Sequence, residues 1–207
     1  MKKKQALEIL NTLKDKQTNL KNKAKELKVT IISQKGNLNK GWAGITLDRI
    51  LGGGDNRQKA DHVWGEIKCF PVYKKKDGKL AAKETMQITM IEKDLNKLTS
   101  NFIKSHVFEK MKKMIIIARK YGQNFELDSN GSQFIHAVFE FNLTGETLQK
   151  LKKDYEYITN SLKLNNDAIS KRFNGELIQS RTKGQGGNSR KSYGFYALPK
   201  FLNSFLN

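Results

Sequence analysis

The chain has 207 residues, 37% of them hydrophobic, which is enough apolar material for a folded domain and excludes a wholly disordered chain. Lys and Arg number 39 against 20 Asp and Glu, and the net charge of +19 favours a polyanionic partner, most commonly nucleic acid, although Lys-rich residue usage alone produces the same excess. A single cysteine, Cys69, excludes an internal disulfide and a zinc site of several thiolates, and no apolar run approaches the roughly 20 residues of a membrane span, so we expect a cytoplasmic protein.

The N-terminal part is basic and helical in pattern. Residues 1–28 predict one amphipathic helix, in which leucines recur among nine lysines. The stretch 37–41 is typical of a loop, and it leads into a predicted helix over 41–51, "GWAGITLDRIL". Three glycines, at positions 52–54, end that helix.

The middle of the chain changes to extended patterns. Residues 63–73 alternate in polarity, residues 75–79 ("KKDGK") predict a turn, and residues 85–91 return as a strand, so the three together predict a hairpin. A short helix is expected within 102–113. The runs "MIIIAR" (114–119) and "QFIHAVFEF" (133–141) are typical of buried strands.

The C-terminal third begins with the clearest helix of the chain, over 144–162, which Thr144 opens. Residues 176–202 then predict a strand, a Gly-rich basic loop, a second strand and a final helix. The order of all these elements predicts an α/β protein with a mixed central sheet flanked by helices.

The stretch "GEIKCFP" (65–71) holds the most informative charges. Glu66 and Lys68 are two residues apart on a predicted strand, so both side chains leave the same face, while Ile67 and Cys69 face a core. Burying charged groups is costly unless they pair or bind a metal ion. The pattern therefore predicts either a functional site or, because charged residues make up 29% of the chain, a chance arrangement on an ordinary strand.

Two further acids strengthen the functional interpretation. Asp61 lies five residues before Glu66, and a bend in the chain would bring both carboxylates to one hard divalent cation such as Mg²⁺. Such an ion assists phosphodiester hydrolysis, and Lys68 would orient the attacking water or stabilise developing charge. Asp48, on the preceding predicted helix, is a further acid that would reach the metal or orient Lys68.

A second basic region lies near the C-terminus. Residues 171–200 contain seven Lys and Arg but one acid, Glu176, and mix them with glycines and aromatic residues. Glycine allows the backbone to approach a ligand closely, and Arg and Lys read guanine edges in the major groove. The alternative is an exposed loop that is merely basic. The two regions together predict one part that cuts nucleic acid and another that reads it.

The order of these motifs resembles one known family. "NKGWAGITLDRIL", "GEIKCFPV", "SHVFEKMKKMIII", "LIQSRTKG" and "GFYALPKFL" are similar to the MutH mismatch-repair endonucleases and the related GATC-cutting type II restriction enzymes, over residues 37–205. The resemblance implies a restriction-endonuclease-like fold, Mg²⁺ as the cofactor, and hydrolysis of double-stranded DNA beside the G of 5′-GATC-3′. It also implies a single endonuclease domain over 1–207, with a basic N-terminal helix (1–36), a catalytic part (37–120) and a DNA-reading part (121–207).

The same resemblance assigns roles to individual residues. Metal ligands would be Asp61, Glu66 and the backbone carbonyl of Ile67, and Lys68 would be the catalytic lysine. Asp48 stands where the family has a glutamate on the helix, and Lys110 matches an active-site lysine. DNA-binding residues would be Lys40, Arg181, Lys183, Gly184 and Tyr196, of which Tyr196 matches a residue that senses adenine methylation.

Three functions remain open from the sequence. The first is a restriction enzyme that cuts unmethylated GATC, supported by the Lys- and Asn-rich composition and by Thr182 in place of a family proline. The second is a mismatch-repair nickase that acts on hemimethylated GATC with a MutL-like activator. The third is a non-catalytic basic DNA-binding protein. The first also predicts a cognate DNA methyltransferase and a homodimer on DNA, since cutting both strands requires two catalytic events.

Overall fold

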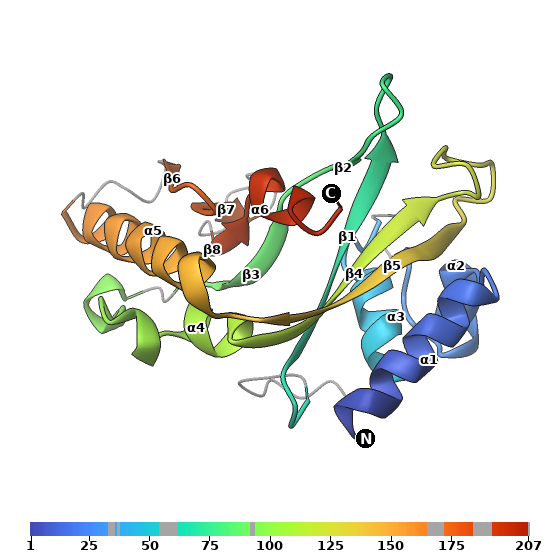
Figure 1. The fold of residues 1–207 in the computed structure, drawn as a ribbon, viewed down its shortest axis with the longest axis horizontal. Coiled ribbons are helices and arrows are strands. Elements are labelled where there is room, and N and C mark those ends of the chain that lie inside the picture. The colour runs from blue at the N-terminus through green and yellow to red at the C-terminus, as the bar shows by residue number, and fades with distance from the viewer. Residues whose placement is uncertain are drawn as a thin grey trace. The chain divides into compact units, whose positions relative to one another are not determined.

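The computed structural model describes residues 1–32, 36, 38–53, 62–91, 94–164, 172–183 and 192–206 (Figure 1). The chain forms two compact units, and each is made from two separate segments of sequence. The first unit contains residues 1–83 and 113–141, and the second contains residues 84–112 and 142–207. No helix in the described part of the chain is both long and apolar enough to cross a membrane.

The first unit is built on a mixed four-stranded sheet with the order β2-β1-β4-β5. Strand β1 pairs in parallel with β4 and antiparallel with β2, so the predicted mixed α/β sheet is confirmed. The strands span Glu66–Lys74 (β1), Leu80–Ala82 (β2), Lys113–Tyr121 (β4) and Gln133–Asn142 (β5). The run at 114–118 is almost wholly buried, as its continuous apolar pattern predicts.

Three helices cover one face of this sheet: α1 (Lys3–Asp15), α2 (Leu20–Glu26) and α3 (Trp42–Ile50). Their apolar side chains join a single core cluster with alternate residues of the strands, among them Ile67, Ile115, Ile117 and Ile135. The alternation follows from the period of two in a strand, which sends every second side chain to the helix-covered face.

The second unit contains an antiparallel sheet with the order β3-β8-β7-β6. Its strands span Met86–Met90 (β3), Phe173–Asn174 (β6), Ile178–Lys183 (β7) and Ser192–Ala197 (β8). Its helices are the 3₁₀ turns η1 (Leu95–Lys97) and η2 (Phe102–Lys104), together with α4 (His106–Met111), α5 (Gly145–Leu164) and α6 (Pro199–Asn203). The predicted short helix within 102–113, the long helix, and the two strands and final helix at the C-terminus are confirmed in type and position. The Gly-rich loop predicted between those strands lies outside the described residues.

The single helix predicted over 1–28 is wrong, because the structure has two helices there. Gln17 adopts a left-handed backbone conformation with φ of 47°, which an α-helix does not accommodate. Asn19 then caps the second helix, since its side-chain oxygen accepts a hydrogen bond from the Lys21 N–H. The leucines continue on one face across this break, and so the sequence pattern alone does not reveal it.

The predicted hairpin has the right turn but the wrong return strand. β1 pairs with β2, only three residues long, around the turn at 75–79. Residues 86–90 form β3, which pairs instead with β8 in the other sheet. A three-residue strand is too short to show an alternating pattern, and the β3–β8 contact joins residues far apart in sequence, so neither feature has a local signal.

Candidate active site

The site begins at Gly65, where the chain enters β1. Gly65 has φ of 140°, and a Cβ atom there would lie 2.3 Å from the Lys113 carbonyl oxygen. Any side chain would therefore clash with the backbone of β4 and strain the chain. The close approach fixes the parallel register, in which Glu66 is opposite Met114 and Lys68 is opposite Ile116.

Glu66 and Lys68 meet on one face of β1, as the period of two predicts. Glu66 is 1% exposed, and its Oε1 lies 2.6 Å from the Lys68 Nζ. The two atoms are at ion-pair distance but lack the alignment of a hydrogen bond. Phe70 and Val72, farther along the same face, are fully buried. A carboxylate in such surroundings carries a desolvation cost that a nearby ammonium offsets only in part.

The other face of the same strand is part of the core. Ile67 is 6% exposed and belongs to the core cluster, and Cys69 packs against that cluster. Gly44 of α3 faces the Cys69 sulfur, and a Cβ there would lie 3.8 Å from Sγ, an ordinary van der Waals distance. The predicted packing role of Cys69 is therefore confirmed. The backbone of Ile67 lies between the two charged residues, opposite Ile115.

Asp48 contacts a histidine. Its Oδ1 lies 2.9 Å from His62 Nε2, again at ion-pair distance without hydrogen-bond alignment. The His62 ring stacks on Trp64, with ring centroids 4.6 Å apart and planes within 4°. The sequence places His62 beside Asp61, but nothing in the pattern joins it to Asp48, fourteen residues earlier.

The donors present are the kind that Mg²⁺ prefers, but the described residues supply only part of a site. Glu66 and Asp48 provide carboxylate oxygens, and the Ile67 carbonyl is a third hard donor. Within the described ranges, no three His, Cys, Asp or Glu residues come together as a group that could hold a metal ion. Asp61, the other predicted ligand, lies outside the described residues. Glu66, buried at the strand start, fits one position of a Mg²⁺ site.

Two of the predicted lysines lie in different units. Lys40 is exposed in the turn before α3, where the neighbouring Asn39 side chain accepts a hydrogen bond from the Gly41 N–H and donates one to the Thr30 carbonyl. The turn therefore holds Lys40 in a fixed backbone position. Lys110 lies in the last turn of α4, in the second unit, and is half-buried.

Arg181 and Tyr196 come together on neighbouring strands β7 and β8. The Arg181 guanidinium lies 4.2 Å from the centre of the Tyr196 ring, in a cation–π arrangement. Tyr196 is 5% exposed. Gly194, opposite Arg181 in the register, has no side chain to push the ring aside, because a Cβ there would lie 3.1 Å from the ring. Lys183 ends the β7 ladder opposite Ser192, and Gly184 lies outside the described residues.

Sequence reasoning missed a buried acid that supports the start of β7. Asp154 of α5 is 6% exposed, and its carboxylate accepts hydrogen bonds from the backbone N–H groups of residues 176, 177 and 178, at 2.6–3.1 Å. A Cβ on Gly175 would lie 2.3 Å from this carboxyl group, so the glycine permits the approach. On the sequence, Asp154 is one of many charges on a helix and carries no distinguishing signal.

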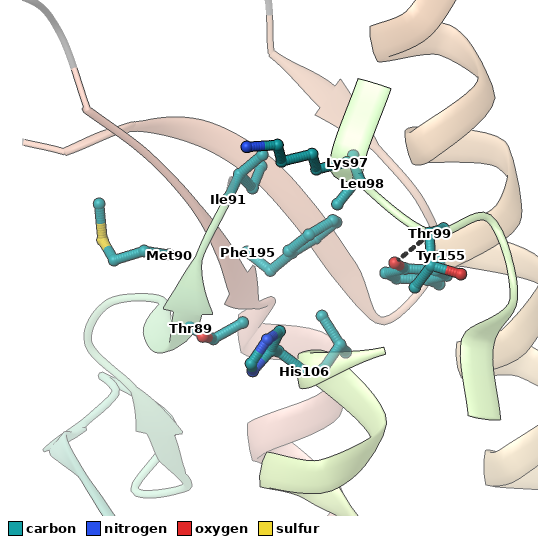
Figure 2. Close-up of a pocket in the computed structure, with 10 residues that line it drawn as sticks. Thr89, Met90, Ile91, Lys97, Leu98, Thr99, His106, Tyr155 and Phe195 are labelled. Atoms are coloured by element: carbon teal, nitrogen blue, oxygen red, sulfur yellow. Dashed lines mark hydrogen bonds between the residues drawn. The ribbon is translucent and has the colours of Figure 1, made fainter. Parts of the chain in front are cut away.

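A cavity of about 430 Å³ lies within the second unit, between β3, η1, α4 and β8 (Figure 2). Phe195 and Tyr155 line it, and each is 1% exposed, so their ring faces are not open to a ligand. The Tyr155 hydroxyl donates to the Thr99 carbonyl at 2.6 Å, and burial raises its pKa. No lining residue is one of the predicted site residues.

Comparison with known proteins supports the sequence resemblance over the centre of the chain. The family model described as "DNA mismatch repair enzyme MutH" matches residues 52–154. The matched region contains Glu66, Lys68 and Lys110, whereas Lys40 and Asp48 precede it and Arg181 follows it. No curated protein matches the chain.

Proposed function

Because the chain belongs to the MutH family and is therefore a DNA endonuclease of the restriction-endonuclease-like type, we propose that it hydrolyses double-stranded DNA at 5′-GATC-3′ as a Mg²⁺-dependent type II restriction enzyme. One observation supports this most: an ion pair of Glu66 and Lys68, with Glu66 almost fully buried, stands at the start of β1 within the matched region. A folded core gains little from such a pair, since burying charges costs stability.

In the proposed site, Asp61, Glu66 and the Ile67 carbonyl hold Mg²⁺. The ion, when bound, polarises the phosphodiester and favours ionisation of water. The Lys68 ammonium lies 2.6 Å from Glu66 Oε1, and its proposed role is to orient the attacking water or stabilise charge on the phosphate oxygens. The resemblance makes Lys110 a further proposed active-site lysine, and Asp48 is proposed to support the site from α3.

The proposed reading machinery belongs to the second unit. Arg181, Lys183 and Gly184 approach guanine edges in the major groove, and Tyr196 meets the adenine that a methyltransferase modifies. The ring of Tyr196 also restrains the Arg181 side chain, which reduces the entropy that Arg181 loses on binding a base. Lys40, exposed in the first unit, holds a backbone phosphate.

This proposal implies particular partners. Double-strand cutting by a chain with one such site calls for a homodimer on DNA or two successive events, and protection of the host's own sites calls for a cognate DNA methyltransferase. The name of the matching family favours a second candidate, a mismatch-repair nickase of hemimethylated GATC with a MutL-like activator. The catalytic residues are the same in both.

One assay separates the candidates. The purified protein is incubated with Mg²⁺ and a GATC-containing plasmid in unmethylated, hemimethylated and fully methylated forms. Complete linear fragments from the unmethylated plasmid alone, without a partner, are the result that we expect. Slow nicking of the hemimethylated plasmid would instead support the repair enzyme. No cutting of any form would contradict both and leave a non-catalytic DNA-binding protein.

A further inference from the structure

His62 has contacts that the proposed chemistry does not use. Together with Asp48 and Trp64 it forms an arrangement that we name the His62 clamp. Asp48 belongs to α3, whereas His62 and Trp64 belong to the turn that leads into β1. The clamp therefore joins a helix to the strand that carries Glu66.

The turn itself is closed by its backbone. The His62 N–H donates to the Gly65 carbonyl, and the Gly65 N–H donates to the His62 carbonyl, both at 3.0 Å. Within this turn the His62 side chain is 8% exposed and lies flat against Trp64. Val63, at the tip of the same turn, is fully exposed. His62 is thus one side chain through which this short turn contacts α3, and Trp64 packs against the core cluster that includes residues of α3.

The Asp48 carboxylate also lies next to Gly53. A Cβ atom on Gly53 would lie 2.2 Å from Asp48 Oδ1, and the Gly53 N–H donates to the Asp48 carbonyl at 2.9 Å. No side chain larger than hydrogen fits at position 53 while Asp48 keeps its place. The absence of a side chain at Gly53 therefore leaves room for the Asp48 carboxylate in its place beside His62.

Among the described residues, Asp48, His62 and Glu66 form no group of three that could hold a metal ion. The His62 nitrogen that would bind a metal, Nε2, instead lies against the Asp48 carboxylate.

We propose that His62 is a positioning residue. It couples Asp48 to the turn before β1 and so fixes the position of the strand start that carries the proposed metal ligand Glu66, without binding the metal itself. The inference rests on the proposed function, because it assigns a role in metal affinity. Residues behind metal ligands typically change affinity about 10- to 100-fold when mutated. In this account Asp48 acts through His62.

The direct test is binding of Mn²⁺, which accepts the same oxygen donors as Mg²⁺, measured by isothermal titration calorimetry on the DNA-free protein. His62→Phe keeps a flat ring on Trp64 but removes the polar contact, and Asp48→Asn removes the charge from the other side. We expect each to weaken Mn²⁺ binding about 10-fold, and the double variant to weaken it no further. His62→Gln, which keeps a polar group, should recover part of the loss.

Matched controls separate the clamp from general damage to the fold. Val63→Ser changes the exposed tip of the same turn and should leave Mn²⁺ affinity unchanged. Gly53→Ala should weaken binding as Asp48→Asn does, because the new methyl group displaces the carboxylate. Gly52→Ala introduces strain at a φ of 76° but meets nothing within 4 Å, so it should lower the melting temperature and leave the affinity intact.

The outcomes are distinguishable. If Asp48→Asn weakens Mn²⁺ binding while His62→Phe does not, Asp48 acts as a ligand by itself and the inference is wrong. The same conclusion follows if neither variant changes the affinity of a protein that binds Mn²⁺ in its wild-type form. If the wild-type protein binds no Mn²⁺, the proposed function is wrong, and the inference that rests on it is wrong as well.

Discussion

At the start of β1 and at the start of β7, a buried carboxylate lies beside a glycine, but the groups that contact the carboxylate differ between the two strands. At β7, Asp154 accepts three backbone hydrogen bonds, which hold the turn before the strand. At β1, Glu66 lies against the ammonium of Lys68 on a largely apolar face. The first carboxylate completes the hydrogen bonding of the backbone and so explains the local fold.

The second carboxylate is explained better by chemistry than by folding. Three hydrogen bonds to one carboxylate stabilise the structure that they join, whereas a buried ion pair contributes little net stability. A residue type and its burial therefore do not distinguish a structural acid from a catalytic one. The groups that face the carboxylate do, and mutations at the two strand starts should separate activity from stability.

The largest expected effect is on activity at β1. Glu66→Gln removes a proposed metal ligand but keeps the shape of the side chain, so cleavage should fall at least about 100-fold. The free energy of unfolding should change little. The substitution removes the buried Glu66 charge, and the Lys68 ammonium that remains is partly exposed and can be solvated by water. Plasmid cleavage and chemical denaturation measure the two effects. A variant that cuts normally would exclude Glu66 from the site.

Lys68→Met should lose both activity and stability. The substitution leaves Glu66 buried beside an apolar side chain, which should lower the free energy of unfolding by about 3 kcal/mol. The double variant Glu66→Gln/Lys68→Met should regain most of that stability while remaining inactive. A double variant that is less stable than Lys68→Met alone would show that the pair is structural after all.

At β7 the opposite is expected, because a mutation of Asp154 should lower stability and leave metal binding unchanged. Asp154→Ala leaves three backbone N–H groups without their acceptor, and we expect a loss of about 3 kcal/mol in the free energy of unfolding. Mn²⁺ affinity, a property of the first unit in this account, should remain at the wild-type value. Loss of Mn²⁺ binding in a protein that is still folded would contradict the division between the two strand starts.

The comparison also shows what a sequence can and cannot reveal. Glu66 and Lys68 were placed on one face because a strand alternates with a period of two, and that rule needs only neighbouring residues. The buried strand at 114–119 was predicted from a continuous apolar run, and the long helix after Thr144 from the capping residue that opens it. Each prediction depends on neighbouring residues in the sequence.

The features that escaped prediction depend on contacts between distant residues or on single backbone angles. Asp48 and His62 meet only because the turn before β1 folds back on α3, and β3 finds its partner across more than a hundred residues. The break between α1 and α2 is set by Gln17, a residue with no special preference for left-handed φ. The roles of Asp61 and Gly184 stay predictions, because both lie outside the described residues.

A smaller effect is expected from the residues of β7 and β8 that we propose to read DNA. Arg181→Ala should weaken binding to a duplex that contains GATC about 10- to 100-fold and leave binding to unrelated DNA nearly unchanged. Tyr196→Phe keeps the ring beneath Arg181 and serves as the control for the stacking contact. Fluorescence anisotropy with both duplexes, at one salt concentration, measures the difference. Equal losses on the two duplexes would mean that Arg181 contacts only phosphates.

The smallest effect is the response of the β7 turn to acid. Contacts with Lys200 and Lys150 lower the pKa of Glu176 below its ordinary value of 4.5. Since the folded-state pKa is the lower one, the stabilisation is fully present above pH 4.5 and is lost as the pH falls through the folded value. Glu176→Gln should therefore be slightly less stable than wild type at neutral pH and equal to it in acid, as urea denaturation at both pH values would reveal.

The central claim is that the Glu66–Lys68 pair belongs to a metal-dependent DNA endonuclease. The most direct measurement compares wild type and Glu66→Gln on unmethylated GATC plasmid, each with Mg²⁺ and with EDTA. We predict cutting by the wild type with Mg²⁺ alone, and no cutting by an equally stable Glu66→Gln protein. Cutting that persists in EDTA, or in the Glu66→Gln variant, would contradict the account.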